Sequence, residues 1–275
     1  MSFSPDWLAL REPADHAARA PQVAAAVFAH FAHRTQMTIV DFGCGTGSNL
    51  RAMALHLPLS QTWRLIDWDE DLLAAARTRL SAWADDAQER DGVLSLRKAD
   101  RTLVVHTQKA DLARDPGRLL EGVDLLTATA FFDLVSADWM DGLCDALAAR
   151  KLPLYAILTY DGHEVWSPSH HADDAVLAAF HAHQKSDKGL GLASGPDAAA
   201  HLTQALQIRA FHVVSGMSPW RLQQGDLLRQ LAQGAASAVT ETGAVNPAEI
   251  EAWRAARENS ASCEIGHVDL FAVPV

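Results

Sequence analysis

The chain has 275 residues, 49% of them apolar, which is enough for one large domain with a sizeable core. Its formal net charge is −11 and its 23 basic residues are dispersed, a distribution that disfavours nucleic acid as a partner. The three cysteines are far apart and lack metal-ligand spacing, which is typical of a reduced cytoplasmic protein. No apolar run approaches the ~20 residues needed to cross a bilayer, and residues 1–19 lack a signal-peptide core. We therefore expect a cytoplasmic protein with no nucleic-acid or membrane partner.

The first elements are predicted to be helical. Trp7 to Phe31 has a helical pattern, and Pro21 lies where a second helix would begin. Residues 1–36 would thus form a helical cap in front of the first strand.

The most informative segment follows this cap. Thr38 to Phe42 is an apolar strand, residues 43–47 form a glycine loop, and Ser48 to Leu57 has a helical pattern. Alternating glycines let the backbone turn sharply and let a ligand lie against bare peptide, where a Cβ would collide. An ordinary tight turn is the alternative. Dinucleotide-binding folds use related loops, but Ser48 occupies the position of the later glycine in that fingerprint.

The next strands each lead into an acidic residue. Trp63 to Asp67 is expected to be a second strand that ends in a carboxylate, and Glu70 to Trp83 a helix with one apolar face. Asp67 could instead cap that helix, a role for which Asp69 competes. The stretch 93–109 allows more than one strand register before Asp111, and residues 124–128 form the fourth predicted strand.

The remaining elements continue the alternation of strands and helices. We expect a helix over Ala137 to Arg150, a fifth strand over 153–159, a helix near 195–205, a strand near 208–214 and a last strand over 266–273. This order predicts an α/β fold, a doubly wound, mostly parallel sheet with helices on both faces. Residues 37–160 would be its ligand-binding core within a single domain spanning 1–275.

The motif Asp41-x-Gly43-x-Gly45-x-Gly47 resembles motif I of the class I S-adenosylmethionine-dependent methyltransferases, and the elements after it come in that family's order. The resemblance covers roughly residues 5 to 160 well and the remainder only by topology. It implies a seven-stranded, Rossmann-like sheet, with S-adenosyl-L-methionine as cofactor and S-adenosyl-L-homocysteine as product. The cofactor-binding residues that it implies, or that adjoin its motifs, are Asp41, Gly43, Cys44, Gly45, Gly47, Asn49, Asp67, Trp68, Asp111, Leu112, Ala128 and Arg19.

Within this set the resemblance implies separate tasks. Asp67 would accept hydrogen bonds from the two ribose hydroxyls, and Asp111 would receive the adenine amino group. The segment around Arg11 and Arg19 resembles the leading helix that covers the cofactor in many of these enzymes. Either arginine could pair with the methionine carboxylate, or both could belong to a surface helix.

Two stretches exceed the minimal fold of the family and are expected to determine substrate choice. They are residues 161–191 and residues 215–262, which would be helical inserts at the carboxyl edge of the sheet. There they could form a lid that excludes water during methyl transfer. An interface between two copies of the chain is the alternative.

The candidates for acid–base catalysis are Asp133, Asp161 and His183, each with a structural role as the alternative. The candidates for contact with the substrate are Phe132, Tyr160, Lys188, Trp220 and Arg221. Five histidines between residues 163 and 183 suggest a metal site, but their spacing is poor and none is predicted.

We therefore expect an enzyme that transfers the methyl group directly to a small molecule. The alternatives are another reaction of the same cofactor (elimination, cyclisation or aminopropyl transfer), a protein or RNA methyltransferase, and a non-catalytic partner module.

Overall fold

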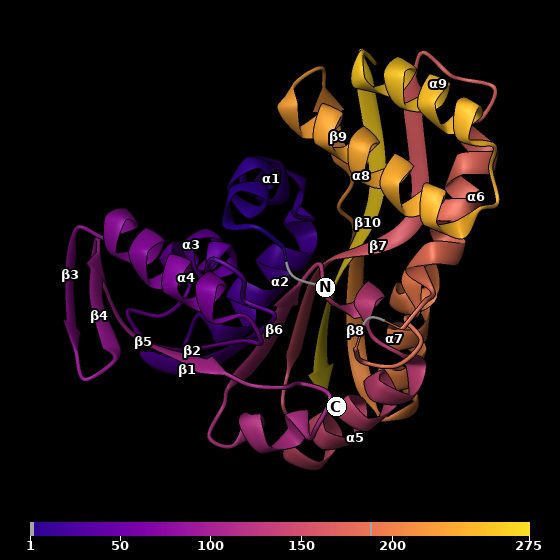
Figure 1. Ribbon diagram of the computed structural model, residues 1–275. Coiled ribbons are helices and arrows are strands. Elements are labelled where there is room, and N and C mark those ends of the chain that lie inside the picture. The colour runs from indigo at the N-terminus through magenta and orange to yellow at the C-terminus, as the bar shows by residue number, and fades with distance from the viewer. Residues whose placement is uncertain (1–2, 188) are drawn as a thin grey trace.

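The computed structural model describes residues 3–187 and 189–275, which form one ten-stranded sheet with helices on both faces (Figure 1). The strand order is β3-β4-β5-β2-β1-β6-β7-β10-β8, and β9 pairs with β10. The strands are β1 (Gln36–Phe42), β2 (Ser60–Asp67), β3 (Asp86–Arg90), β4 (Val93–Lys98), β5 (Arg101–Lys109), β6 (Leu125–Thr129), β7 (Leu154–Ser167), β8 (Phe211–Met217), β9 (Trp220–Gln223) and β10 (Ser262–Pro274).

The helices wind along both faces of this sheet. The α-helices are α1 (Pro5–Ala18), α2 (Pro21–Phe31), α3 (Ser48–Met53), α4 (Glu70–Trp83), α5 (Ala137–Arg150), α6 (Asp173–Gln184), α7 (Ala198–Ile208), α8 (Asp226–Thr242) and α9 (Pro247–Glu258). Short 3₁₀ helices are η1 (Ala54–His56), η2 (Pro116–Leu120), η3 (Phe132–Leu134) and η4 (Gly195–Asp197).

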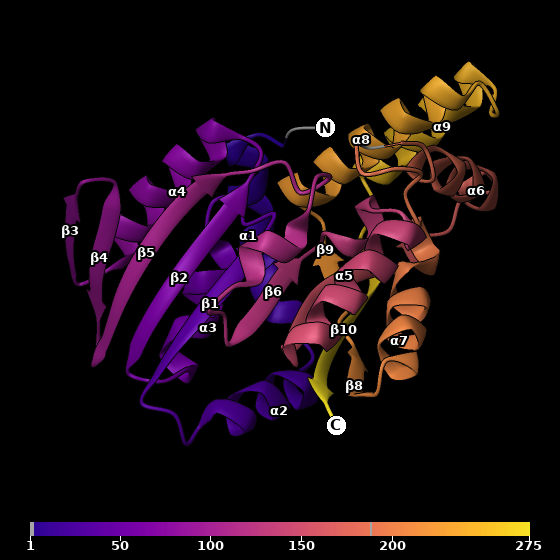
Figure 2. The ribbon, with the colours of Figure 1, turned by 90° about the horizontal axis from the view of Figure 1, so that it is seen from below.

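Two hydrophobic cores lie on opposite faces of the sheet, as expected for a doubly wound fold. The first joins the sheet to α2, α3 and α4, and the second joins it to α5 and α7 (Figure 2). The central strands β5, β2, β1, β6 and β7 are parallel, while β10 runs antiparallel to β7 and β8. Because β6 and the first half of β7 are buried on both faces, their sequences are nearly continuous apolar runs.

The number of strands predicted from the sequence was wrong. Seven strands, β5-β2-β1-β6-β7-β10-β8, form the expected sheet, and β3, β4 and β9 extend it to ten. Val93 to Lys98 alternates between buried and exposed positions, so it pairs as a half-buried strand with β5 and with β3. This antiparallel hairpin resolves the ambiguous register of residues 93–109.

The fifth predicted strand also extends further than expected. It continues from residue 159 to Ser167 as β7, because the first residues of β10 pair with it antiparallel. This extension lies with α6, α8 and α9 beyond the main sheet (Figure 1). Together they enclose a third core of buried side chains, among them Trp166, Trp220, Leu228 and Trp253. The two inserts predicted from the sequence therefore pack into one unit.

Candidate active site

The glycine loop after β1 has a backbone that only glycine adopts readily. Gly43, Gly45 and Gly47 have φ values of +62°, +51° and +73°. A Cβ on Gly45 would lie 2.9 Å from Leu8 Cδ1 of α1, and one on Gly43 would lie 2.8 Å from Phe131 Cδ2. The loop is therefore bare peptide under a close cover of apolar side chains.

Asp41 supplies a buried carboxylate beneath this loop. Its Oδ1 accepts hydrogen bonds from Asn49 Nδ2 at 2.8 Å and from Thr127 Oγ1 at 2.7 Å. Its Oδ2 is buried and has no partner among the described residues. Burial raises the pKa of Asp41 to about 6, against the effect of its two hydrogen bonds. Arg19 Nη2 donates to Asn49 Oδ1 at 2.9 Å, so the guanidinium reaches the same cluster from the end of α1.

Asp67 ends β2 beside the loop. Its Oδ2 accepts from the Gly45 backbone N–H at 2.9 Å and its Oδ1 from the Asp69 N–H at 3.0 Å. Asp69 provides the cap of α4, since its side chain accepts from Asp71 and Leu72, so Asp67 is not needed for that role. Burial raises the pKa of Asp67. Each of its oxygens retains a lone pair for a ligand hydroxyl.

The other residues expected at the cofactor lie near this edge with differing exposure. Cys44 is a buried free thiol in the loop, and burial raises its pKa, which fits a packing role. Ala128 is buried in β6. Trp68, with 64% of its surface exposed, follows β2, and Asp111 lies two residues after β5 and accepts from the Ala113 N–H. Leu112 is buried, and its carbonyl accepts from Trp139 Nε1 at 2.7 Å.

A cavity of about 130 Å³ lies between the glycine loop and α1. Its walls include Asp41, Gly43, Gly45, Asn49 and Asp67. The enclosed space covers only the part of the edge nearest the loop, because half of the predicted cofactor residues do not line it: Arg19, Gly47, Trp68, Asp111, Leu112 and Ala128.

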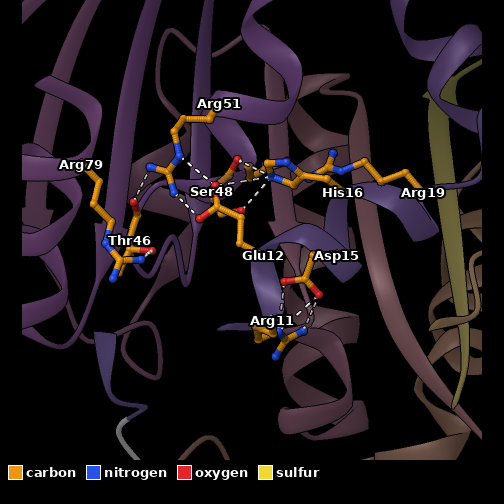
Figure 3. A network of polar contacts seen from close by, with 10 residues as sticks. Arg11, Glu12, Asp15, His16, Arg19, Thr46, Ser48, Arg51 and Arg79 are labelled. Atoms are coloured by element: carbon orange, nitrogen blue, oxygen red, sulfur yellow. Dashed lines mark hydrogen bonds and ion pairs between the residues drawn. The ribbon is translucent and has the colours of Figure 1, made fainter. Parts of the chain in front are cut away.

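Polar contacts hold α1 over the loop (Figure 3). Glu12 pairs with Arg51 of α3 through contacts of 2.9 Å and 2.6 Å, and Arg51 also donates to the Thr46 carbonyl. His16 Nε2 lies 2.9 Å from Ser48 Oγ. These contacts hold the helix over the small cavity as its cover.

A second cavity of about 630 Å³ adjoins the first. It lies between α1, the β7–β10 extension, α6 and α8, and the two cavities share Phe3, Arg11, Ala130 and Leu134 as wall residues. Ala130 and Leu158, which both line it, have φ values of +50° and +53°. Backbone strain of this kind in non-glycine residues concentrates at ligand sites.

Some of the predicted catalytic and substrate residues come together at this larger cavity. Asp133, Tyr160, His183 and Trp220 line it. Asp133 Oδ1 is buried and has no partner among the described residues, and burial raises the pKa of this carboxyl to about 6. Tyr160 Oη lies 2.9 Å from His181 Nε2, and His183 Nε2 lies 3.0 Å from Glu241 Oε2. The side chain of Trp220 donates to Asp15 Oδ1 at 3.1 Å.

The structure places the other predicted residues elsewhere. Asp161 does not line the cavity and accepts from the His163 N–H, and Phe132 is buried in the core behind it. Arg221 is exposed on β9 and pairs with Glu264 at 3.1 Å. Lys188 lies outside the described residues. Among those residues, no group of three or more metal-ligating side chains is placed to hold a metal, and no helix is long and apolar enough to span a membrane.

Two titratable wall residues of the larger cavity were not expected from the sequence. They are Glu164 of β7 and His267 of β10. The sequence carried no signal for them, because the strand extension that aims them at the cavity was not predicted.

Known structures with a similar fold support this architecture. The YcgJ protein of Bacillus subtilis is 10% identical, with a TM-score of 0.52, covering 93% of this chain and 99% of its own. The Bacillus halodurans protein BH2331, described as a candidate methyltransferase, is 12% identical with the same TM-score, covering 92% and 100%. A cyclopropane-fatty-acyl-phospholipid synthase-like protein of Lactobacillus casei is 16% identical, again with a TM-score of 0.52, covering 95% and 98%.

No model of a known protein family matches the sequence, and no curated protein matches it. The chain nevertheless shares the Rossmann-like, class I methyltransferase fold of these structures, with β3 and β4 added beyond β5 and β9 paired with β10.

Proposed function

We propose that the protein is a methyltransferase that uses S-adenosyl-L-methionine to methylate a small molecule. The observation that supports this proposal most directly is that two cavities adjoin. One lies on the glycine loop between two acids, and the other, directly beside it, has mostly apolar walls. The fold shared with a candidate methyltransferase supports the same function.

The residues around the small cavity fit such a cofactor. The loop leaves room for the amino-acid part against bare peptide, and the unpartnered Asp41 Oδ2 is a buried acceptor for its ammonium group. Arg19 would hold the carboxylate, since its Nε is buried without a partner among the described residues. Asp67 would bind the ribose hydroxyls, and Trp68, Asp111 and Leu112 would border the adenine at the exposed ends of β2 and β5.

The bound cofactor supplies an electrophilic methyl group on a sulfonium, so the chain mainly has to align the acceptor and exclude water. The walls of the larger cavity do both. Tyr160 and Trp220 flank the acceptor, α6 and α8 cover it, and Asp133 stands where the two cavities meet. A cavity of about 630 Å³ has the size typical of small-molecule sites. The three free, buried thiols suit a cytoplasmic location.

Calorimetric titration with S-adenosylhomocysteine tests the cofactor directly. We expect micromolar binding, and Asp67→Ala should weaken it by about 1–3 kcal/mol through the lost ribose contacts. Asp71→Ala, an exposed acid in the next helix, should leave it unchanged. No binding by folded protein would refute the proposal, and unchanged affinity of Asp67→Ala would remove that residue from the site.

Product analysis then separates methyl transfer from other reactions of the cofactor. Turnover of a methyl acceptor should release S-adenosylhomocysteine in equal amount to methylated product. Formation of any other sulfur product would place the reaction in a different class.

A further inference from the structure

The larger cavity is lined by many aromatic side chains. Six of its wall residues carry a phenyl, phenol or indole ring, and five of them come from α1, β7, α6 and β9. They are Phe3, Trp7, Tyr160, Trp166, Phe180 and Trp220. Aromatic walls of this kind bind rings by stacking and edge contacts, and they also attract cations.

Arg11, the positively charged residue of α1 on the wall of this cavity, already has an acidic partner. Arg11 holds Asp15 with two nitrogens, at 3.0 Å and 3.1 Å, and its guanidinium lies over the Trp220 ring at 4.8 Å. On α6, His183 is paired with Glu241. Neither group is a free cation that could receive an anionic ligand.

The remaining titratable groups from β7 and β10 add no positive charge. His267 of β10 is buried, and burial lowers its pKa to about 3, so the ring is neutral. Burial and the nearby acids Glu164, Asp161 and Asp133 raise the pKa of Tyr160, so its hydroxyl keeps its proton. Of these three acids, Glu164 and Asp133 line the cavity itself.

Two carboxylates on the cavity wall, Asp133 of η3 and Glu164 of β7, form no ion pair within 4 Å among the described residues. Arg11 near Asp133 and Arg257 near Glu164 lie farther away and only oppose the rise in pKa that burial causes. Asp133 Oδ1 accepts no hydrogen bond, and Glu164 accepts one from Trp166 Nε1. A ligand that brings a positive charge and N–H donors would stabilise these half-buried carboxylates, and above all the buried Oδ1 of Asp133.

Asp133 also has a distinct position. It lies between Ala130 and Leu134, the residues of the same loop that line both cavities. A group bound beside Asp133 is therefore next to the space assigned to the cofactor, whereas Glu164 lies farther along β7, beyond Tyr160.

Building on the methyl transfer proposed above, we propose that the acceptor is an amine on a flat apolar body, bound as its ammonium by Glu164 and Asp133 and methylated on nitrogen. Asp133 takes one proton from the ammonium, which frees the nitrogen lone pair. A nitrogen–carbon bond forms as the carbon–sulfur bond breaks, and the electron pair of that bond stays on sulfur. The products are S-adenosylhomocysteine and a methylated ammonium, and the proton on Asp133 returns to water.

The test uses two sets of probes that differ only in their end group. They are tryptamine, tryptophol and indole-3-acetate, and 2-phenylethylamine, 2-phenylethanol and phenylacetate. Each is titrated calorimetrically at pH 8 into protein saturated with S-adenosylhomocysteine. We expect each amine to bind at least about tenfold more tightly than its alcohol, as a charge-assisted hydrogen bond provides, and each carboxylate to bind most weakly.

Variants of Glu164 and Asp133 test whether these two acids cause the preference for an amine over an alcohol. Glu164→Gln and Asp133→Asn should each weaken amine binding about tenfold and leave alcohol binding unchanged. Asp174→Asn, an exposed acid on α6 outside the cavity, should change neither. With tryptamine as acceptor and the methyl donor present, Glu164→Gln should mainly raise KM, whereas Asp133→Asn should lower kcat.

The outcomes separate the two proposals. Equal binding of amine and alcohol, tighter binding of either carboxylate, or no amine binding by protein that holds S-adenosylhomocysteine would overturn the amine proposal alone. Failure to bind S-adenosylhomocysteine would overturn the proposed function. Amine preference that survives in both variants would move the recognition away from Asp133 and Glu164.

Discussion

The two cavities at the carboxyl edge of the sheet are lined by different kinds of group. The small one is walled largely by the glycine loop and by the acids of β1 and β2, and side chains of α1 and of the segment after β6 close it. The large one is walled by side chains from distant segments, namely α1, β7, α6, β9, α8 and β10. Local sequence patterns therefore indicate the loop and the acids of the first cavity, whereas long-range packing determines the second.

This difference fits the ligand that we propose for each cavity. A site for one fixed cofactor gains from bare backbone and positive φ angles, which leave little room for variation. A site for a particular acceptor gains from side chains on helices that can change without disturbing the sheet. Substitutions in the two regions should therefore have separable effects.

The largest effect is expected from a substitution in the glycine loop. Gly45→Val places a branched side chain at a φ of +51° and at 2.9 Å from Leu8 Cδ1, where the bound cofactor would also lie. Affinity for S-adenosylhomocysteine should fall by about a hundredfold or more, measured by calorimetry.

Gly92→Val is the matched control for backbone strain. Gly92 also has a positive φ of +78°, but a Cβ there meets nothing within 4 Å. The control should lose a similar amount of stability and keep its affinity. Equal affinity in both variants would show that the loop does not contact the cofactor.

A substitution in α8, which covers the larger cavity, should impair use of the acceptor and spare binding of the cofactor. Gly234 lies on α8 at the larger cavity, and a Cβ there meets nothing within 4 Å. Gly234→Phe should fill the cavity from its cover, lowering kcat/KM for the acceptor about tenfold or more while S-adenosylhomocysteine still binds.

The control for this variant is Gly142→Phe on α5, an exposed helical glycine with open space around it and away from both cavities. It should leave kcat/KM unchanged. Full activity of Gly234→Phe would place the acceptor outside the larger cavity and would favour a different role for α8.

The sequence predicted the first region well for the same physical reason. Apolar strands, glycines and strand-end acids are local patterns, and helices such as Glu70–Trp83 and Ala137–Arg150 were predicted with their correct bounds. The sheet, the glycine loop and the positions of Asp41 and Asp67 all follow from such patterns.

The second region could be predicted only in part. Tyr160 was predicted to contact the substrate because it follows a predicted strand, and Trp220 because its indole offers a flat apolar wall. Glu164 and His267 were missed, since their orientation depends on the pairing of β7 with β10, across about a hundred residues of sequence. Arg221 looked suitable for anion binding, but strand alternation turns it outward while Trp220 faces the cavity.

A smaller effect is expected where the two regions meet. Burial raises the pKa of Asp133 to about 6 in the folded chain, from an ordinary value of 3.8. At pH 5 the folded state therefore binds a proton that the unfolded state largely lacks, and this stabilisation is lost as the pH rises through 6. Relative to Asp133→Asn, the wild-type protein should lose about 1 kcal/mol of unfolding free energy between pH 5 and pH 8.

Urea denaturation of both proteins at the two pH values measures this change. Asp174→Asn should track the wild-type protein at both, because its carboxylate is exposed on α6. A difference between wild type and Asp133→Asn that does not vary with pH would mean that Asp133 keeps an ordinary pKa. Asp133 would then be a weaker base toward the ammonium group of the acceptor.

The smallest effect concerns the cover that both regions share. Helix α1 places Leu8 against the glycine loop and leaves only about 130 Å³ beside it, below the range typical of small-molecule sites. The cofactor can therefore enter only when α1 moves away, which requires the Glu12–Arg51 pair to separate. Both side chains of this pair are mostly buried, at 19% and 8% exposure. Glu12→Gln keeps the shape and one hydrogen bond but removes the charge, so opening should become easier.

Stopped-flow tryptophan fluorescence reports this motion, with Trp7→Phe as the reference that isolates the signal of Trp7 on α1 from those of the other seven tryptophans. Association and dissociation of S-adenosylhomocysteine should both become about two- to fivefold faster in Glu12→Gln, with little change in Kd, because the contact reforms once the ligand is bound. Glu251→Gln, which breaks a similar pair with Arg254 on α9, should change neither rate. Unchanged rates in Glu12→Gln would show that entry bypasses α1. Weaker binding of S-adenosylhomocysteine at an unchanged association rate would instead show that Glu12 is part of the cofactor site. Helix α1 would then be a wall of that site and would not control entry to it.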